Sequence, residues 1–238
     1  MRRSTALFAI CLAVTGAQGI NPNVPYRGEF VFSRIRYGSL GGWGFRGSTW
    51  AHDYPRADQH LSRILRDLTT IDATAAGSNV FDLSDPDIFR FPIIYLSEPG
   101  YWVMDGLDVP RLREYLLKGG LIIFDDFEEE HLLNVEAQMR RALPELRPIE
   151  IRIDHPIFDS FFRMKTIDFP HPMENRLRAR YYAIFERNDP SGRMLALINH
   201  NSDLAEYWEW SATGMFPVDI TSDAYKLGVN YIVFGMTH

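Results

Sequence analysis

The segment from Lys118 to Phe127 (KGGLIIFDDF) constrains the fold of this chain more than any other. A glycine pair after a helix-forming stretch is typical of a helix C-terminus followed by a tight turn. The apolar run at 121–124 is short and ends at two carboxylates, as expected for a buried strand of a parallel sheet. Ligands bind beyond the carboxyl ends of such strands, so Asp125 and Asp126 become the first candidates for a chemical site.

Short apolar or alternating segments predict further strands, and segments with helical periodicity lie between them. Strands are expected at residues 30–37, 79–83, 92–96, 121–124, 148–153, 180–185 and 194–198. Helices are expected after Pro55 with an apolar stripe at 61–68, at 108–119, at 134–143 and from Ser222 toward the C-terminus, with an irregular insertion at 163–179. This order predicts an α/β fold with a mostly parallel central sheet, which the strand pair near the C-terminus extends in antiparallel fashion.

Residues 1–19 have the pattern of a secretory signal peptide rather than of a folded element. Two arginines precede an apolar run at 6–14, and small residues lead to an expected cleavage site after Gly19. The apolar run is too short to cross a bilayer comfortably, and an uncleaved N-terminal anchor is the alternative. We therefore expect an exported, periplasmic protein, with no transmembrane span in the mature chain and a single domain at 20–238.

Cysteine content, charge and missing motifs exclude several kinds of function. Cys11 is the only cysteine and lies in the signal segment, so the mature chain has no thiolate nucleophile and no disulfide. The formal net charge of −6 argues against nucleic acid as a partner. The chain lacks the GxSxG motif of serine hydrolases, and its glycine-rich loop at 38–47 does not match the nucleotide-binding patterns.

Carboxylates and histidines near the predicted strand ends supply the catalytic and metal candidates. The catalytic candidates are Asp125, Asp126 and His155, because a histidine held extended before proline can pair with a carboxylate as base or as metal ligand. The candidate ligands of a divalent metal ion are Asp125, Asp126 and His131. A strand-end aspartate that caps the next segment, and an acidic run that forms a solvated surface, are the alternatives. No other cofactor is expected.

Aromatic residues near polar loops supply a second set of candidates, for ligand binding. Trp43 and Trp102 lie in predicted loops, and Trp208 follows a polar segment that contains His200 and Asn201. This composition is similar to that of a carbohydrate-binding surface, where aromatic faces stack on sugars. Tryptophans that pack inside the protein are the alternative explanation.

Four segments together carry a resemblance to a known family. They are FSRIRY at 32–37, LREYLLKGGLIIFDD at 112–126, DHPIF at 154–158 and KLGVN at 226–230. With these segments the chain resembles the DUF4159 family of bacterial proteins from about residue 28 to residue 238. The resemblance implies a flavodoxin-like three-layer sandwich similar to the class I glutamine amidotransferases. In that fold the elbow after the corresponding strand carries a nucleophilic cysteine, where this chain has Asp125 and Asp126.

The sequence favours a non-catalytic binding or interaction module of the cell envelope, with a protein partner such as the other subunits of a membrane-associated complex. Absence of a nucleophile motif weighs against an enzyme. A metal-assisted hydrolase with its site at Asp125 and Asp126 is the first alternative, and it requires His155 to lie beside them. A carbohydrate-binding protein is the second, and it requires exposed tryptophans.

Overall fold

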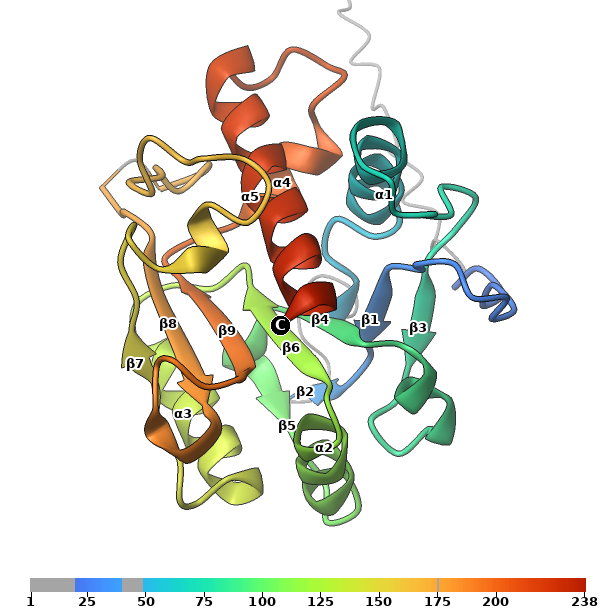
Figure 1. Ribbon diagram of the computed structural model, residues 1–238, viewed down its shortest axis with the longest axis vertical. Helices are drawn as coiled ribbons and strands as arrows, with labels where there is room; N and C mark the ends of the chain where they lie inside the picture. The colour runs from blue at the N-terminus through green and yellow to red at the C-terminus, as the bar shows by residue number, and fades with distance from the viewer. Residues whose placement is uncertain (1–19, 40–48, 175) are drawn as a thin grey trace, which may run out of the picture.

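A seven-stranded sheet lies between two layers of helices in the computed structural model, which describes residues 20–39, 49–174 and 176–238 (Figure 1). The predicted signal peptide and Trp43 lie outside the described residues. The strand order is β3-β1-β4-β6-β9-β8-β7. The strands from β3 to β9 in this order pair in parallel, whereas β8 and β7 pair antiparallel. The mixed, mostly parallel α/β architecture expected from the sequence is thus confirmed.

The strands are short, and most lie within the predicted segments. They are β1 (Ser33–Ile35), β3 (Asn79–Phe81), β4 (Ile93–Ser97), β6 (Leu121–Asp125), β7 (Ile149–Glu150), β8 (Arg180–Phe185) and β9 (Met194–His200). A separate antiparallel pair joins β2 (Gly38–Ser39) to β5 (Trp102–Val103).

Two apolar cores lie between the sheet and the helices, one on each face of the sheet. The helices α1 (Arg56–Leu68), α4 (Leu204–Glu209) and α5 (Val218–Thr237) cover one face of the sheet, and α2 (Asp108–Leu117) and α3 (His131–Ala142) cover the other. Side chains alternate between the faces along each strand. In β4, Ile93 and Tyr95 therefore join the core under α1, α4 and α5, whereas Ile94 and Leu96 join the core over α2 and α3. Short 3-10 helices lie in the connections: η1 (Thr49–Ala51), η2 (Pro86–Arg90), η3 (Pro99–Tyr101), η4 (Pro156–Phe158) and η5 (Glu186–Asn188).

Two helices begin earlier than predicted. Helix α3 begins at His131 and not at Asn134, because the Asn134 side chain donates to the carbonyls of Pro99 and Trp102 instead of capping the helix. Helix α5 begins at Val218, directly after a proline, and Ser222 bonds to the Val218 carbonyl inside the first turns. No helix in the described part of the chain combines the length and the apolar character that crossing a bilayer demands.

Helix α5 approaches its neighbours closely at Gly228. A Cβ atom on Gly228 would lie 2.8 Å from the Trp208 ring and 2.9 Å from a methyl group of Leu61. Both neighbours are buried, and each would have to shift to admit the added methyl group.

We expect Gly228→Ala to lower the free energy of unfolding by about 1–3 kcal/mol, because overpacking forces side chains out of their preferred rotamers. The matched control is Gly106→Ala, since nothing lies within 4 Å of a Cβ atom at that position. Urea denaturation of the two variants measures the difference. Equal midpoints would show that α5 does not depend on this close approach.

Candidate functional site

Acidic side chains converge where parallel strands of the sheet end. Glu98 follows β4, Asp126 follows β6, and Asp203 and Glu206 follow β9. Parallel strands bring their carboxyl ends to one edge of the sheet, which is where α/β proteins bind ligands. The loop after η1 adds two further residues at the same edge. We refer to the six residues as the acidic cluster: His52, Asp53, Glu98, Asp126, Asp203 and Glu206.

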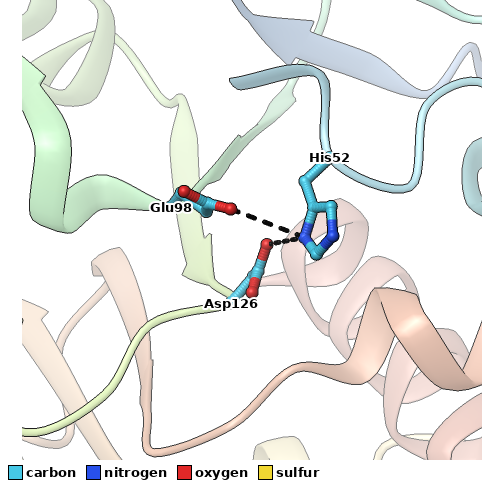
Figure 2. Close-up of side chains that lie close together, drawn as sticks. All are labelled: His52, Glu98 and Asp126. Carbon is cyan, nitrogen blue, oxygen red and sulfur yellow. Dashed lines mark hydrogen bonds and ion pairs between the residues drawn. The ribbon is translucent and has the colours of Figure 1, made fainter. Parts of the chain in front are cut away.

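His52 lies between carboxylates at the surface of the acidic cluster (Figure 2). Its Nδ1 atom is 2.7 Å from Oδ2 of Asp126 and 3.6 Å from Oε1 of Glu98. The hydrogen bond to Asp126 raises the pKa of His52 to about 10. Burial, followed by the charge of Asp126, raises the pKa of Glu98 to about 7. The His52 side chain is still 47% exposed, so a solvent molecule can reach its ring.

Three residues of the acidic cluster have a left-handed backbone. The φ angles are 61° at Asp53, 48° at Glu98 and 63° at Asp126, which is unfavourable for residues other than glycine. Local hydrogen bonds hold these turns: Tyr37 donates to the carbonyl of Glu98, and the Asp126 amide donates to the carbonyl of Ser202 at 2.9 Å. Backbone strain of this kind gathers at functional sites, where the surrounding structure enforces it.

A buried arginine holds the loop that carries His52 and Asp53. The Arg34 guanidinium, on β1, donates to the carbonyls of Trp50 at 3.0 Å and His52 at 2.7 Å. It also forms a fully buried ion pair with Asp58 of α1, at 2.6 Å. The loop is thereby fixed to the sheet on one side and to α1 on the other.

The innermost carboxylates of the acidic cluster are crowded against one another. Asp53 is 0% exposed at its side chain, and no hydrogen-bond donor reaches either of its oxygens. Burial, followed by the charge of Asp126, raises the pKa of Asp53 and of Asp203 well above the usual range of a carboxyl group. Within the described residues, three overlapping groups have ligand atoms within 4.8 Å of one another, which is close enough to share a metal ion: His52–Glu98–Asp126, His52–Asp53–Glu206 and Asp53–Asp126–Asp203.

The family model for a domain of unknown function, DUF4159, matches residues 31–236. The chain belongs to the DUF4159 family. The matched range contains every residue of the acidic cluster and every strand of the seven-stranded sheet. No curated protein matches the chain in sequence. The family description names no activity, so the function of this DUF4159 domain has to be argued from the site.

Asp125 supports the fold, whereas its neighbour Asp126 belongs to the acidic cluster. It is fully buried and accepts hydrogen bonds from the Tyr95 hydroxyl, the Asn199 amide and the backbone amide of Leu204. Burial raises its pKa to about 6, an effect that these donors oppose. Its carboxylate therefore ties three segments together and does not face the acidic cluster's solvent side.

The expected meeting of His155 with Asp125 and Asp126 does not occur. His155 packs against Phe185, with ring centroids 5.6 Å apart, and Phe185 pairs with Met194 at the amino end of β9. The acidic cluster lies beyond the carboxyl end of that strand, about 20 Å away along its seven residues. His155 also accepts a hydrogen bond from the Ile157 amide, which fixes it in its own loop.

His131 was one of the three candidate metal ligands. In the described part of the chain it belongs to none of the groups that can share an ion. Its ring lies against Tyr101, with centroids 5.0 Å apart, at the start of α3. His200 and Asn201 hold the loop after β6, since His200 Nε2 lies 3.0 Å from the Glu129 carbonyl and Asn201 accepts from the Glu129 amide. These contacts explain both residues as supports of the turn that carries Asp126.

The tryptophan candidates that the structure describes are not presented to a ligand. Trp102 and Trp208 are buried in the two cores, one on each side of the sheet. Trp210, which lies two residues after Trp208, is half-buried under the Arg56 guanidinium, 5.0 Å from its ring. The aromatic clusters in the sequence therefore reflect packing at these positions, and a sugar-stacking surface gains no support from them.

Of the acidic cluster, only Asp126 was predicted from the sequence as a site residue. Glu98 and Asp203 each follow a predicted strand, and this position at a strand's carboxyl end is the feature of the sequence that could have identified them as site residues. His52 and Asp53 precede a helix instead, and only the fold of the loop after η1 brings them to the same edge.

We expect Arg34→Ala to lower the free energy of unfolding by about 3–5 kcal/mol, because it leaves the Asp58 charge buried without its partner. The control is Arg36→Ala on the same chain segment, whose ion pair with Asp82 is exposed. An exposed pair contributes about 0–1 kcal/mol, so the control should change little. Chemical denaturation of both variants measures the contrast, and similar losses would contradict a special role for the buried pair.

Proposed function

We propose that the chain is a hydrolase whose reaction centre is the acidic cluster. The observation that carries this proposal is the contact between His52 and Asp126 at the carboxyl ends of the parallel strands. A carboxylate oxygen accepts hydrogen bonds, so His52 donates to Asp126 through Nδ1 and keeps Nε2 for a water molecule or a substrate. A half-exposed imidazole oriented by a carboxylate is suited to proton transfer, and a pKa of about 10 makes His52 the proton donor to the leaving group.

The turn after β6 supports the same location. Asp126 follows the strand at once and has a φ angle of 63°, so the chain turns sharply there. The flavodoxin-like, amidotransferase-like fold that the family resemblance implies carries its nucleophilic cysteine at a turn of this kind. In the function we propose, the turn at Asp126 takes the place of the turn that carries the cysteine, with a carboxylate and an imidazole instead of the thiol. Chemistry at the site then differs from that of the amidotransferases, while the position is kept.

We expect His52→Gln to lower the rate of hydrolysis by about 10²–10⁴-fold, the usual contribution of a proton-transferring side chain. A panel of 4-nitrophenyl esters, phosphates and glycosides gives the measurement. His155→Gln is the matched control, because that histidine lies at the opposite end of the sheet.

Two results would reject the hydrolase. One is a wild-type chain that turns over no member of the panel, and the other is a His52→Gln variant as fast as the wild type.

An interaction module of the cell envelope is the second candidate. It is supported by apolar side chains that are exposed on helices and loops, namely Leu107, Leu133, Met173 and Val218. Export through the segment at 1–19 and a periplasmic location belong to this proposal. Purification of the protein from its native membrane fraction tests it. A stable protein partner supports the module, and a chain that elutes alone under all salt conditions rejects it.

A further inference from the structure

We propose that Asp53, Asp126 and Asp203 form a binding site for one divalent cation of the Mg²⁺, Mn²⁺ or Ca²⁺ type. The site lies beneath His52, at the buried end of the acidic cluster. Its use in a reaction rests on the proposed hydrolase function, whereas binding of the cation does not.

The unpartnered carboxylate of Asp53 is the first observation behind this site. Its side chain is 0% exposed, and neither oxygen receives a hydrogen bond. A buried polar group without a partner is rare and demands an explanation such as a missing ion. The nearby cation, Arg34, is already committed to Asp58 and to two backbone carbonyls. The groups that face Asp53 are other carboxylates and, at 3.8 Å, the Nδ1 atom of His52.

The geometry of the three carboxylates is the second observation. One oxygen from each of Asp53, Asp126 and Asp203 lies within 4.8 Å of the other two. Oxygen ligands of Mg²⁺ and Ca²⁺ lie about 2.1–2.5 Å from the ion, so two ligands of one ion are at most about 4–5 Å apart. Three oxygen ligands without sulfur favour these hard cations.

The surroundings orient the three side chains as ligands. Oδ2 of Asp126 accepts from Ser97 at 2.9 Å and from His52, which leaves Oδ1 for another partner. Asp203 accepts from the Glu206 amide at 2.9 Å. Asp53 is set by its left-handed backbone in the loop that Arg34 holds. Hydrogen bonds to metal-bound carboxylates fix the ligands in this way and raise metal affinity.

The cation would supply Lewis-acid activation of water or of the scissile group to the proposed hydrolase. His52 is then the neighbour that exchanges protons and not a ligand of the ion. Three carboxylates against one divalent cation also leave the interior with much less uncompensated charge than they do alone.

The test uses the full chain stripped of metal with EDTA and then dialysed. Titration with MnCl₂, MgCl₂ and CaCl₂ by calorimetry should show one cation per chain for at least one of the three. Asp53→Asn and Asp203→Asn should each weaken binding by about 100-fold or more, since each removes a ligand and not merely a supporting hydrogen bond. His52→Gln should keep binding within about tenfold, the lower end of the effect of a supporting residue. Asp67→Asn, on the exposed surface of α1, is the control for unspecific binding by acidic groups.

Stability gives an independent reading. Without metal, Asp53→Asn should raise Tm by about 3 °C or more, because burying an amide avoids the free-energy cost of desolvating or neutralising a carboxylate beside like charges. The same variant should lose the further rise in Tm that Mn²⁺ gives the wild type. If either variant fails to fold, the paramagnetic resonance signal of Mn²⁺ with the wild-type chain reports the number of bound ions directly.

The outcomes separate this site from the proposed function. Absence of binding by all three cations, or equal binding by the wild type and Asp53→Asn, overturns the cation site. Hydrolysis that EDTA leaves unchanged also overturns its use in the reaction, while the hydrolase survives. One bound cation that depends on Asp53 and Asp203 supports the site, even where no substrate of the panel is hydrolysed.

Discussion

Burial of like charges at one edge of the sheet is the constraint on which the functional part of this structure depends. Asp53, Asp126 and Asp203 lie close together with little access to water, and burial raises the pKa of Asp53 and Asp203. Such an arrangement is unfavourable by itself, because desolvation and mutual repulsion both oppose it. It persists because the rest of the molecule, with two apolar cores on the two faces of one sheet, over-determines the positions of the strand ends.

The ion pair between Arg34 and Asp58 is the main device that connects those cores to the site. A buried ion pair adds little net stability compared with apolar residues of similar size, so its presence calls for another reason. Here the same guanidinium donates to the carbonyls of Trp50 and His52. It thereby converts the rigidity of β1 and α1 into a fixed position for the loop that supplies His52 and Asp53. Tyr37 and Ser97 do the same for the turns at Glu98 and Asp126.

The two adjacent aspartates at the end of β6 differ in role: Asp125 supports the fold, and Asp126 belongs to the acidic cluster. Asp125 points into the sheet's buried side, where three donors satisfy it. Asp126 lies on the turn, contacts His52 and belongs to two of the groups that can share a cation. The proposed cation site and the proposed proton-transferring histidine at this turn would together account for the strained backbone, the unpartnered Asp53 and the exposed imidazole.

The sequence by itself determined the α/β class, the parallel strands, the glycine turn after α2 and the importance of the segment that ends at Asp126. These follow from local periodicity and from turn residues, which act over a few positions. Helix starts at His131 and Val218 were misplaced: Asn134 bonds to loop carbonyls that only the folded chain supplies, and Ser222 bonds back to the Val218 carbonyl inside its own helix instead of capping it. Only the tertiary structure decided which residues form the site. It brought His52 and Asp53, which lie far from Asp126 in the chain, to that edge, and it placed His155 at the other end of β9. Such contacts depend on where the folded structure holds its loops, and the spacing of residues in the sequence does not predict those positions.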